Sequence, residues 1–166
     1  MESNRVCSVR TLERRSMVLT QSDAKYLIEV LKVIKSGEII TFPSPGEQTV
    51  LEAQSDELSS DKFLFYINRK GQYNLKKCTY VSRYNNVYNL LRVDINGPPH
   101  DNPDGTTVHC PHIHIYKEGY NLSWAYPLEV EIKTDPKDLI MVLIDFLKYN
   151  NLKDISGLSI QDGGLV

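Results

Sequence analysis

The sequence predicts a single α+β domain in which an antiparallel, strongly twisted sheet of six to seven strands packs against two main helices. Apolar residues recur at helical spacing near both ends of the chain and alternate along most of its middle. The length of 166 residues is typical of one domain, and 41% hydrophobic with 24% charged residues is an ordinary globular composition.

The composition also excludes several classes of protein. A net charge of −2 argues against a strong, sequence-blind nucleic-acid binder, which is normally basic. No apolar run approaches the roughly 20 residues of a membrane span, and the first residues lack the apolar core of a signal peptide. Three widely spaced cysteines indicate free thiols in a reducing compartment. We therefore expect a cytoplasmic protein that has no membrane partner.

The first regular element is expected after a basic arm, residues 1–18, which has no clear periodicity and can be mobile. Thr20 and Asp23 resemble a capping box, and Gly37 offers a C-terminal stop. Apolar residues at helical spacing lie between them, and these are Ala24, Leu27, Ile28, Leu31 and Ile34. The pattern predicts a helix over 21–35.

The middle of the chain has the alternation that is typical of strands. The expected strands are 38–42, 49–53, 63–67, 77–84, 87–95, 112–117 and 122–127, the last extended by 128–132. Asn85 and Asn86 tolerate a positive φ and predict a hairpin turn. The segment 96–111 holds four prolines and two glycines, so we expect no regular element there.

The last main element is a helix predicted over 136–149. Asp135 supplies a capping carboxylate, and Pro136 suits the first helical position. A broad apolar stripe follows, made of Leu139, Ile140, Leu143, Ile144, Phe146 and Leu147. We expect this stripe to lie on the sheet.

All the histidines of the chain fall within 15 residues, and they are His100, His109, His112 and His114. In a strand, His112 and His114 share one face about 6–7 Å apart, while Ile113 points to the core. That spacing lets both imidazoles reach one metal ion.

The remaining ligands are expected from the loop that precedes this strand. The candidates are His100, Asp101, Asp104, His109 and Cys110. Zinc takes neutral imidazole, thiolate or carboxylate, usually four in a tetrahedron. We therefore expect one zinc ion per chain, which would also hold the 96–111 loop in one shape. Two alternatives stay open: a metal-free acid–base pair of histidines, or ordinary polar residues.

Three segments resemble a small family from bacteria and their mobile elements. They are GPPHDNPDG at 97–105, PHIHIYKEGY at 111–120 and WAYPL at 124–128. In size and style the whole chain also resembles the zinc-containing anti-CRISPR proteins that inhibit type II effector nucleases. This resemblance implies a stoichiometric inhibitor of a Cas effector nuclease in the host cytoplasm, one that blocks nucleic-acid loading and uses its metal for structure.

The alternative function is a ribonuclease of the toxin–antitoxin type, which would bind RNA directly. His112 and His114 would then serve as acid and base, and Arg83 would steady the charged phosphorane. Tyr116 or Trp124 would hold a base of the substrate. A metal-dependent hydrolase is a further possibility, and it would need an open coordination position on the metal.

Overall fold

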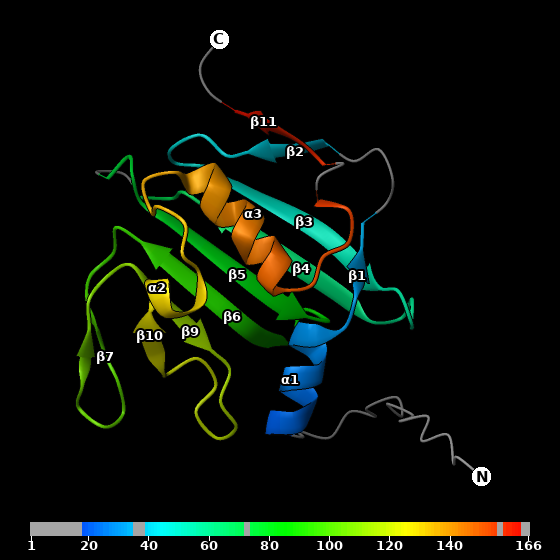
Figure 1. Cartoon of the computed structure of the whole chain (residues 1–166), viewed down its shortest axis with the longest axis horizontal. Helices are drawn as coiled ribbons and strands as arrows, with labels where there is room; N and C mark the ends of the chain where they lie inside the picture. Colours follow the sequence, from blue (N-terminus) through cyan, green and yellow to red (C-terminus); the bar gives the residue numbers. More distant parts are fainter. Residues whose placement is uncertain (1–17, 35–38, 72–73, 156–157, 164–166) are drawn as a thin grey trace.

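The computed structural model describes residues 18–34, 39–71, 74–155 and 158–163, and it confirms the α+β class. One seven-stranded antiparallel sheet forms the main layer, in the order β1-β3-β4-β5-β6-β9-β10 (Figure 1). Its strands are β1 (Lys32–Val33), β3 (Gln48–Ser55), β4 (Lys62–Asn68), β5 (Cys78–Tyr84), β6 (Tyr88–Ile95), β9 (His112–Ile115) and β10 (Ala125–Pro127). The predicted arm 1–18 lies almost entirely outside the described residues.

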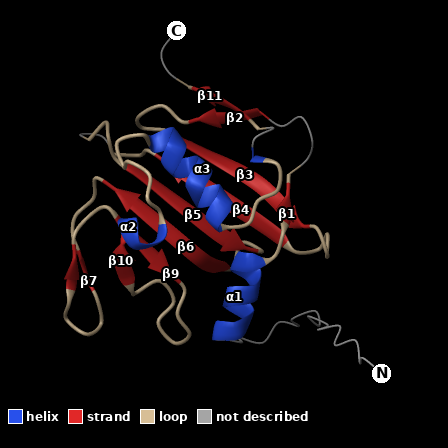
Figure 2. Ribbon diagram, viewed as in Figure 1, coloured by secondary structure: helices blue, strands red, loops and turns tan. Residues whose placement is uncertain are grey.

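Two short strand pairs accompany the main sheet. The parallel pair joins β2 (Ile39–Phe42) to β11 (Ser159–Asp162), and the antiparallel pair joins β7 (His100–Asp101) to β8 (Thr107–Val108). Figure 2 shows the β7 strand standing beside β10 at one margin of the fold. The expectation of no regular element in 96–111 was therefore wrong, because Gly105, at φ 83°, allows the turn that pairs β7 with β8.

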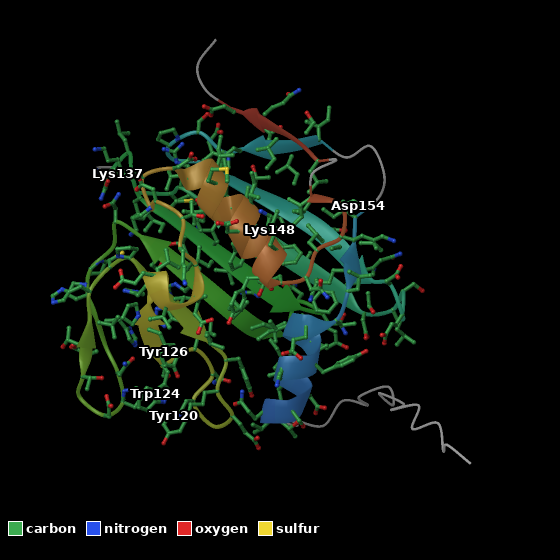
Figure 3. The ribbon with its side chains drawn as sticks, viewed as in Figure 1. Tyr120, Trp124, Tyr126, Lys137, Lys148 and Asp154 are labelled. Carbon is green, nitrogen blue, oxygen red and sulfur yellow. The ribbon has the colours of Figure 1, made fainter. Side chains whose placement is uncertain are left out.

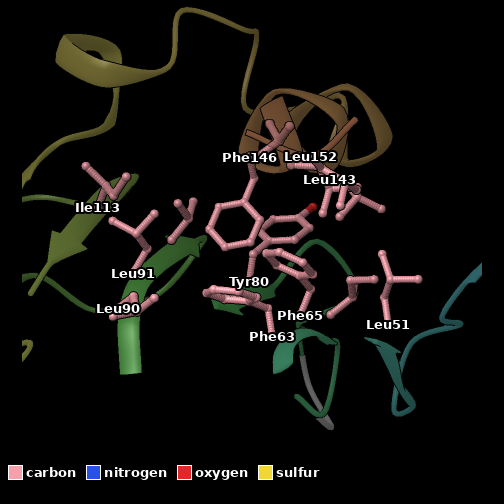
Figure 4. Close-up of a cluster of buried hydrophobic side chains, with 14 of the residues drawn as sticks. Leu51, Phe63, Phe65, Tyr80, Leu90, Leu91, Ile113, Leu143, Phe146 and Leu152 are labelled. Carbon is pink, nitrogen blue, oxygen red and sulfur yellow. The ribbon is translucent and has the colours of Figure 1, made fainter. Parts of the chain in front are cut away.

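The core lies between the sheet and α3 (Leu139–Tyr149), which crosses one face of the sheet (Figure 1). Phe146 of α3 is fully buried, with its ring 6.3 Å from that of Phe65 and 5.8 Å from that of Tyr80 (Figure 4). The Tyr80 hydroxyl donates to the carbonyl of Leu139 at 2.7 Å, so its polar end is satisfied. The predicted apolar stripe thus covers the sheet as expected.

The start of the last helix and the structure of the segment 128–132 differ from the predictions. The helix predicted over 136–149 begins at Leu139, because Asp138 rather than Asp135 caps it by accepting from the Met141 amide at 3.0 Å. Asp135 instead accepts from the Lys137 amide in the preceding turn. The strand extension expected over 128–132 is the short helix α2 (Leu128–Glu131).

The first helix is also shorter than predicted. Thr20 caps the helix as predicted, with its side chain accepting a hydrogen bond from the Asp23 amide, but α1 (Gln21–Glu29) ends six residues before the predicted residue 35. The chain turns into β1, where Lys32 pairs with Ser55 of β3. Lys32 is fully buried, and its Nζ donates to the carbonyls of Ile28, Val30 and Asn150 at 2.7–2.9 Å. The helical spacing of residues 31 and 34 therefore does not extend the helix, because the chain pairs with β3 from Lys32 onward.

Lys32 makes the stability of the fold depend on pH. Burial lowers the pKa of Lys32 to about 7, whereas the unfolded chain keeps the ordinary value of 10.5. The unfolded state therefore binds more protons above pH 7, so the free energy of unfolding rises with pH. From pH 7 to 8.5 we expect a rise of about 1.5 kcal/mol that is absent in Lys32→Met. Urea unfolding of both proteins in a chelator tests this, and equal slopes against pH would contradict it.

None of the helices within the described residues has the length and apolar character that a membrane crossing needs.

Candidate metal centre

The register of two neighbouring strands brings an acid to the predicted histidines. β6 pairs with β9 so that Asp94 faces His112 and Arg92 faces His114. Directly opposed residues of an antiparallel pair share one face of the sheet. The pair between them, Val93 with Ile113, points to the core on the other face. Ile113 therefore lies where the sequence predicted it.

The three ligand atoms form a tight, buried group. Asp94 Oδ2 lies 3.4 Å from His112 Nε2 and 3.5 Å from His114 Nε2, and the exposed fractions of the three residues are 6%, 3% and 4%. One ligand atom of each residue lies within 4.8 Å of the other two. Both distances exceed the ~2.9 Å of a good hydrogen bond. They match the edge of roughly 3.3–3.4 Å that a tetrahedron with metal bonds near 2.0–2.1 Å requires.

A backbone carbonyl sets the state of the His114 ring. Nδ1 of His114 lies 2.8 Å from the carbonyl oxygen of Leu122, and a carbonyl only accepts, so Nδ1 carries a hydrogen. In the neutral imidazole, Nε2 then holds the lone pair and points it at the Asp94 carboxylate. Two acceptors that face each other at 3.5 Å repel, so either a proton on Nε2, which then donates to Asp94, or a metal ion between the two groups is needed to remove that repulsion.

The Asp94 carboxylate is held in its charged form. Oδ1 accepts from the Thr79 hydroxyl at 2.7 Å, and the Arg92 Nε donates to Oδ2 at 2.8 Å. Burial by itself raises the pKa of Asp94, but the imidazoles, the Thr79 hydroxyl and the Arg92 guanidinium hold it well below its usual range. A carboxylate that is ionised and fixed in position is suited to bind a metal ion.

His100 is the predicted loop ligand that comes nearest to this group. Its ring centroid lies 4.6 Å from that of His114 and 6.0 Å from that of His112. Its Nε2 donates to the carbonyl of Ser123 at 2.8 Å. His100 is half-buried on β7, and it is not one of the three residues whose ligand atoms meet.

The other predicted loop ligands are turned to different partners. Cys110 Sγ lies 3.0 Å from the Gly97 amide and donates to the carbonyl of Asp94 at 3.1 Å, while burial raises the pKa of this thiol. Asp101 accepts from the Thr107 hydroxyl, and Asp104 accepts from the Thr106 hydroxyl and amide. His109 is exposed. The structure does not bring these four side chains into the group.

The residues that the ribonuclease alternative requires do not converge on the imidazoles. Arg83 donates to Asn89 at 2.8 Å and lies over the ring of Tyr66. Tyr116 is 3% exposed, and its hydroxyl donates to the carbonyl of Leu19. The Trp124 ring instead lies edge-to-face with that of Tyr120 (Figure 3), and the Lys117 Nζ lies 4.2 Å from the Trp124 ring centroid.

Asn102 fastens the 96–111 segment to the edge of the main sheet with two hydrogen bonds. Asn102 Nδ2 donates to the carbonyl of Ala125 at 3.1 Å, and Asn102 Oδ1 accepts from the Ala125 amide at 2.8 Å. This pair of bonds imitates a neighbouring strand and covers the edge of β10. The shape of the 96–111 segment therefore has a source other than a metal.

Sequence reasoning missed Asp94 and Thr79 as members of this group, and it considered Arg92 only as a source of positive charge. Alternation along β6 does place Arg92 and Asp94 on one face, which was the available signal. The pairing of β6 with β9 was not visible in the sequence, because a 16-residue segment separates the two strands.

Comparison with known proteins yields one family. The family described as DUF6978, a family of unknown function, matches residues 19–152, a stretch that contains the whole histidine cluster. No curated protein and no solved structure matches the chain.

Proposed function

Because the chain belongs to the DUF6978 family of unknown function, we propose its role from the site: it is a zinc-binding protein. Asp94, His112 and His114 hold one ion per chain. The observation that carries the proposal is the spacing of the carboxylate oxygen from the two imidazole nitrogens, which fits a tetrahedral ion better than a hydrogen bond. Two nitrogens and one oxygen are a ligand set that suits zinc.

The burial of the three ligands supports a structural ion. A catalytic zinc keeps one position open to water or substrate. These three residues are only 3–6% exposed, which leaves a substrate little access to an ion between them. A structural ion fits a protein that acts by binding a partner without turnover. The resemblance to zinc-containing anti-CRISPR proteins supports a Cas effector nuclease as that partner, with blocked nucleic-acid loading as the effect.

The metal content of the untagged wild-type protein tests the zinc proposal. We expect inductively coupled plasma mass spectrometry to find close to one zinc per chain after purification without chelators. Protein that carries no zinc and binds none when Zn²⁺ is added would refute the proposal. Iron in place of zinc would point to an oxygenase-type site, since two histidines and one carboxylate also suit Fe²⁺.

Activity assays separate the two candidate roles. Inhibition of a type II nuclease that saturates at one protein per nuclease would support the stoichiometric role. RNA cleavage that a chelator leaves unchanged would support the ribonuclease alternative instead. The burial of His112 and His114 is the reason that we favour the first role, because a phosphodiester must reach an acid or base to be cleaved.

A further inference from the structure

We infer that His100 supplies the fourth zinc ligand, so that the ion joins the β7–β8 hairpin to the main sheet; this rests on the proposed zinc site. Asp94, His112 and His114 come from the sheet, and they leave one position of a tetrahedron unfilled. His100 comes from the separate β7–β8 pair, which the Asn102 side chain also ties to the main sheet through Ala125.

The first argument for His100 as a ligand is the spacing of the three imidazole rings. Ring centroids lie 4.9 Å apart for His112 and His114, 4.6 Å for His114 and His100, and 6.0 Å for His112 and His100. Rings that share one tetrahedral ion have centroids roughly 5 Å apart, given metal–nitrogen bonds near 2.0–2.1 Å. The three distances bracket that value. The nitrogens of His100 lie outside the group formed by the other three ligand atoms, so the inference requires the hairpin to move inward when zinc binds.

The second argument is the way in which the protein orients His100. Its Nε2 donates to the carbonyl of Ser123, and Nδ1 of His114 donates to the carbonyl of Leu122, both at 2.8 Å. Two consecutive carbonyls thus hold one nitrogen of each ring and leave the other nitrogen with its lone pair. A histidine that binds a metal characteristically donates its second nitrogen to a carbonyl or carboxylate in this way.

The other loop candidates lack such an arrangement. The Cys110 thiol already contacts two backbone groups, and His109 is exposed. Of the two loop histidines, His100 therefore has both the proximity and the hydrogen-bonded second nitrogen that are typical of a metal ligand, and His109 provides a matched control.

The consequence is a hairpin whose docking depends on the metal. Asn102 covers the edge of β10 through Ala125, and it lies two residues beyond His100. Zinc bound to His100 would hold this cover in place. Without zinc, the hairpin retains only its hydrogen bonds, and the edge strand opens more often.

A competition assay with a chromophoric zinc chelator tests the ligand assignment. We expect His100→Ala to bind zinc at least ~100-fold more weakly than wild type, since a lost ligand costs more than the roughly 10–100-fold of a supporting residue. We expect His109→Ala to bind as wild type does. Wild-type affinity in His100→Ala would overturn the inference, whereas a wild-type protein that binds no zinc would refute the proposed function itself.

Two further measurements do not depend on how well the variant folds. X-ray absorption of the wild-type zinc protein should show three imidazole ligands, and two would overturn the assignment. Hydrogen exchange of the Ala125 amide should be slower in zinc than in chelator. Equal exchange rates in zinc and in chelator would show that zinc does not hold the β7–β8 hairpin against the main sheet.

Discussion

Replacing His112 and His114 together with alanine is expected to abolish zinc binding. The double variant loses two of the three side chains whose ligand atoms meet, and Asp94 by itself cannot hold a tetrahedral ion. We expect the zinc content to fall from about one ion per chain to background in mass spectrometry, a loss of more than ~10³ in affinity. This is the largest functional effect that the structure predicts.

Loss of zinc must be separated from loss of the fold. The exposed His109→Ala serves as the control, because it removes an imidazole from the same region and should keep its zinc. Asp94→Asn preserves the shape of the side chain but removes its charge, so circular dichroism should stay native while zinc binding weakens. A correctly folded double variant that still carries one zinc per chain would show that the ion binds elsewhere.

The largest expected effect on stability comes from Phe146. This ring is fully buried between α3 and the sheet, where it contacts Phe65 and Tyr80 (Figure 4). Phe146→Ala removes that contact and leaves a cavity, at a cost of about 3–5 kcal/mol in the free energy of unfolding. For a domain of this size, that corresponds to a Tm lower by about 10 °C.

Denaturant unfolding and thermal melts measure the Phe146 effect directly. Met141 lies on the same helix and is 40% exposed, so Met141→Ala should change stability by less than about 1 kcal/mol. Similar losses in both variants would mean that α3 does not pack on the sheet as described.

The sequence indicated the class of the fold because periodicity reports which residues face the core. Alternation in β4, β5 and β6 predicted strands that the structure confirms, and Asn85 and Asn86 adopt the positive φ expected of their turn. The ends of the helices and strands were predicted less well, because contacts with neighbouring elements decide where each element ends. The end of α1 depends on the pairing of Lys32 with Ser55. The burial of Lys32 depends in turn on the carbonyl of Asn150, which lies 118 residues away in the sequence.

The sequence by itself determined that a cluster of imidazoles exists and that His112 and His114 share one face. It also offered loop residues, His100 and His109 among them, as candidates for the remaining ligands. Only the tertiary structure decided that Asp94 joins His112 and His114 in one buried group, and that the carbonyls of Leu122 and Ser123 orient two of the rings. Alternation along one strand is a local property of the backbone, whereas the register between two strands depends on contacts that form only when the chain folds.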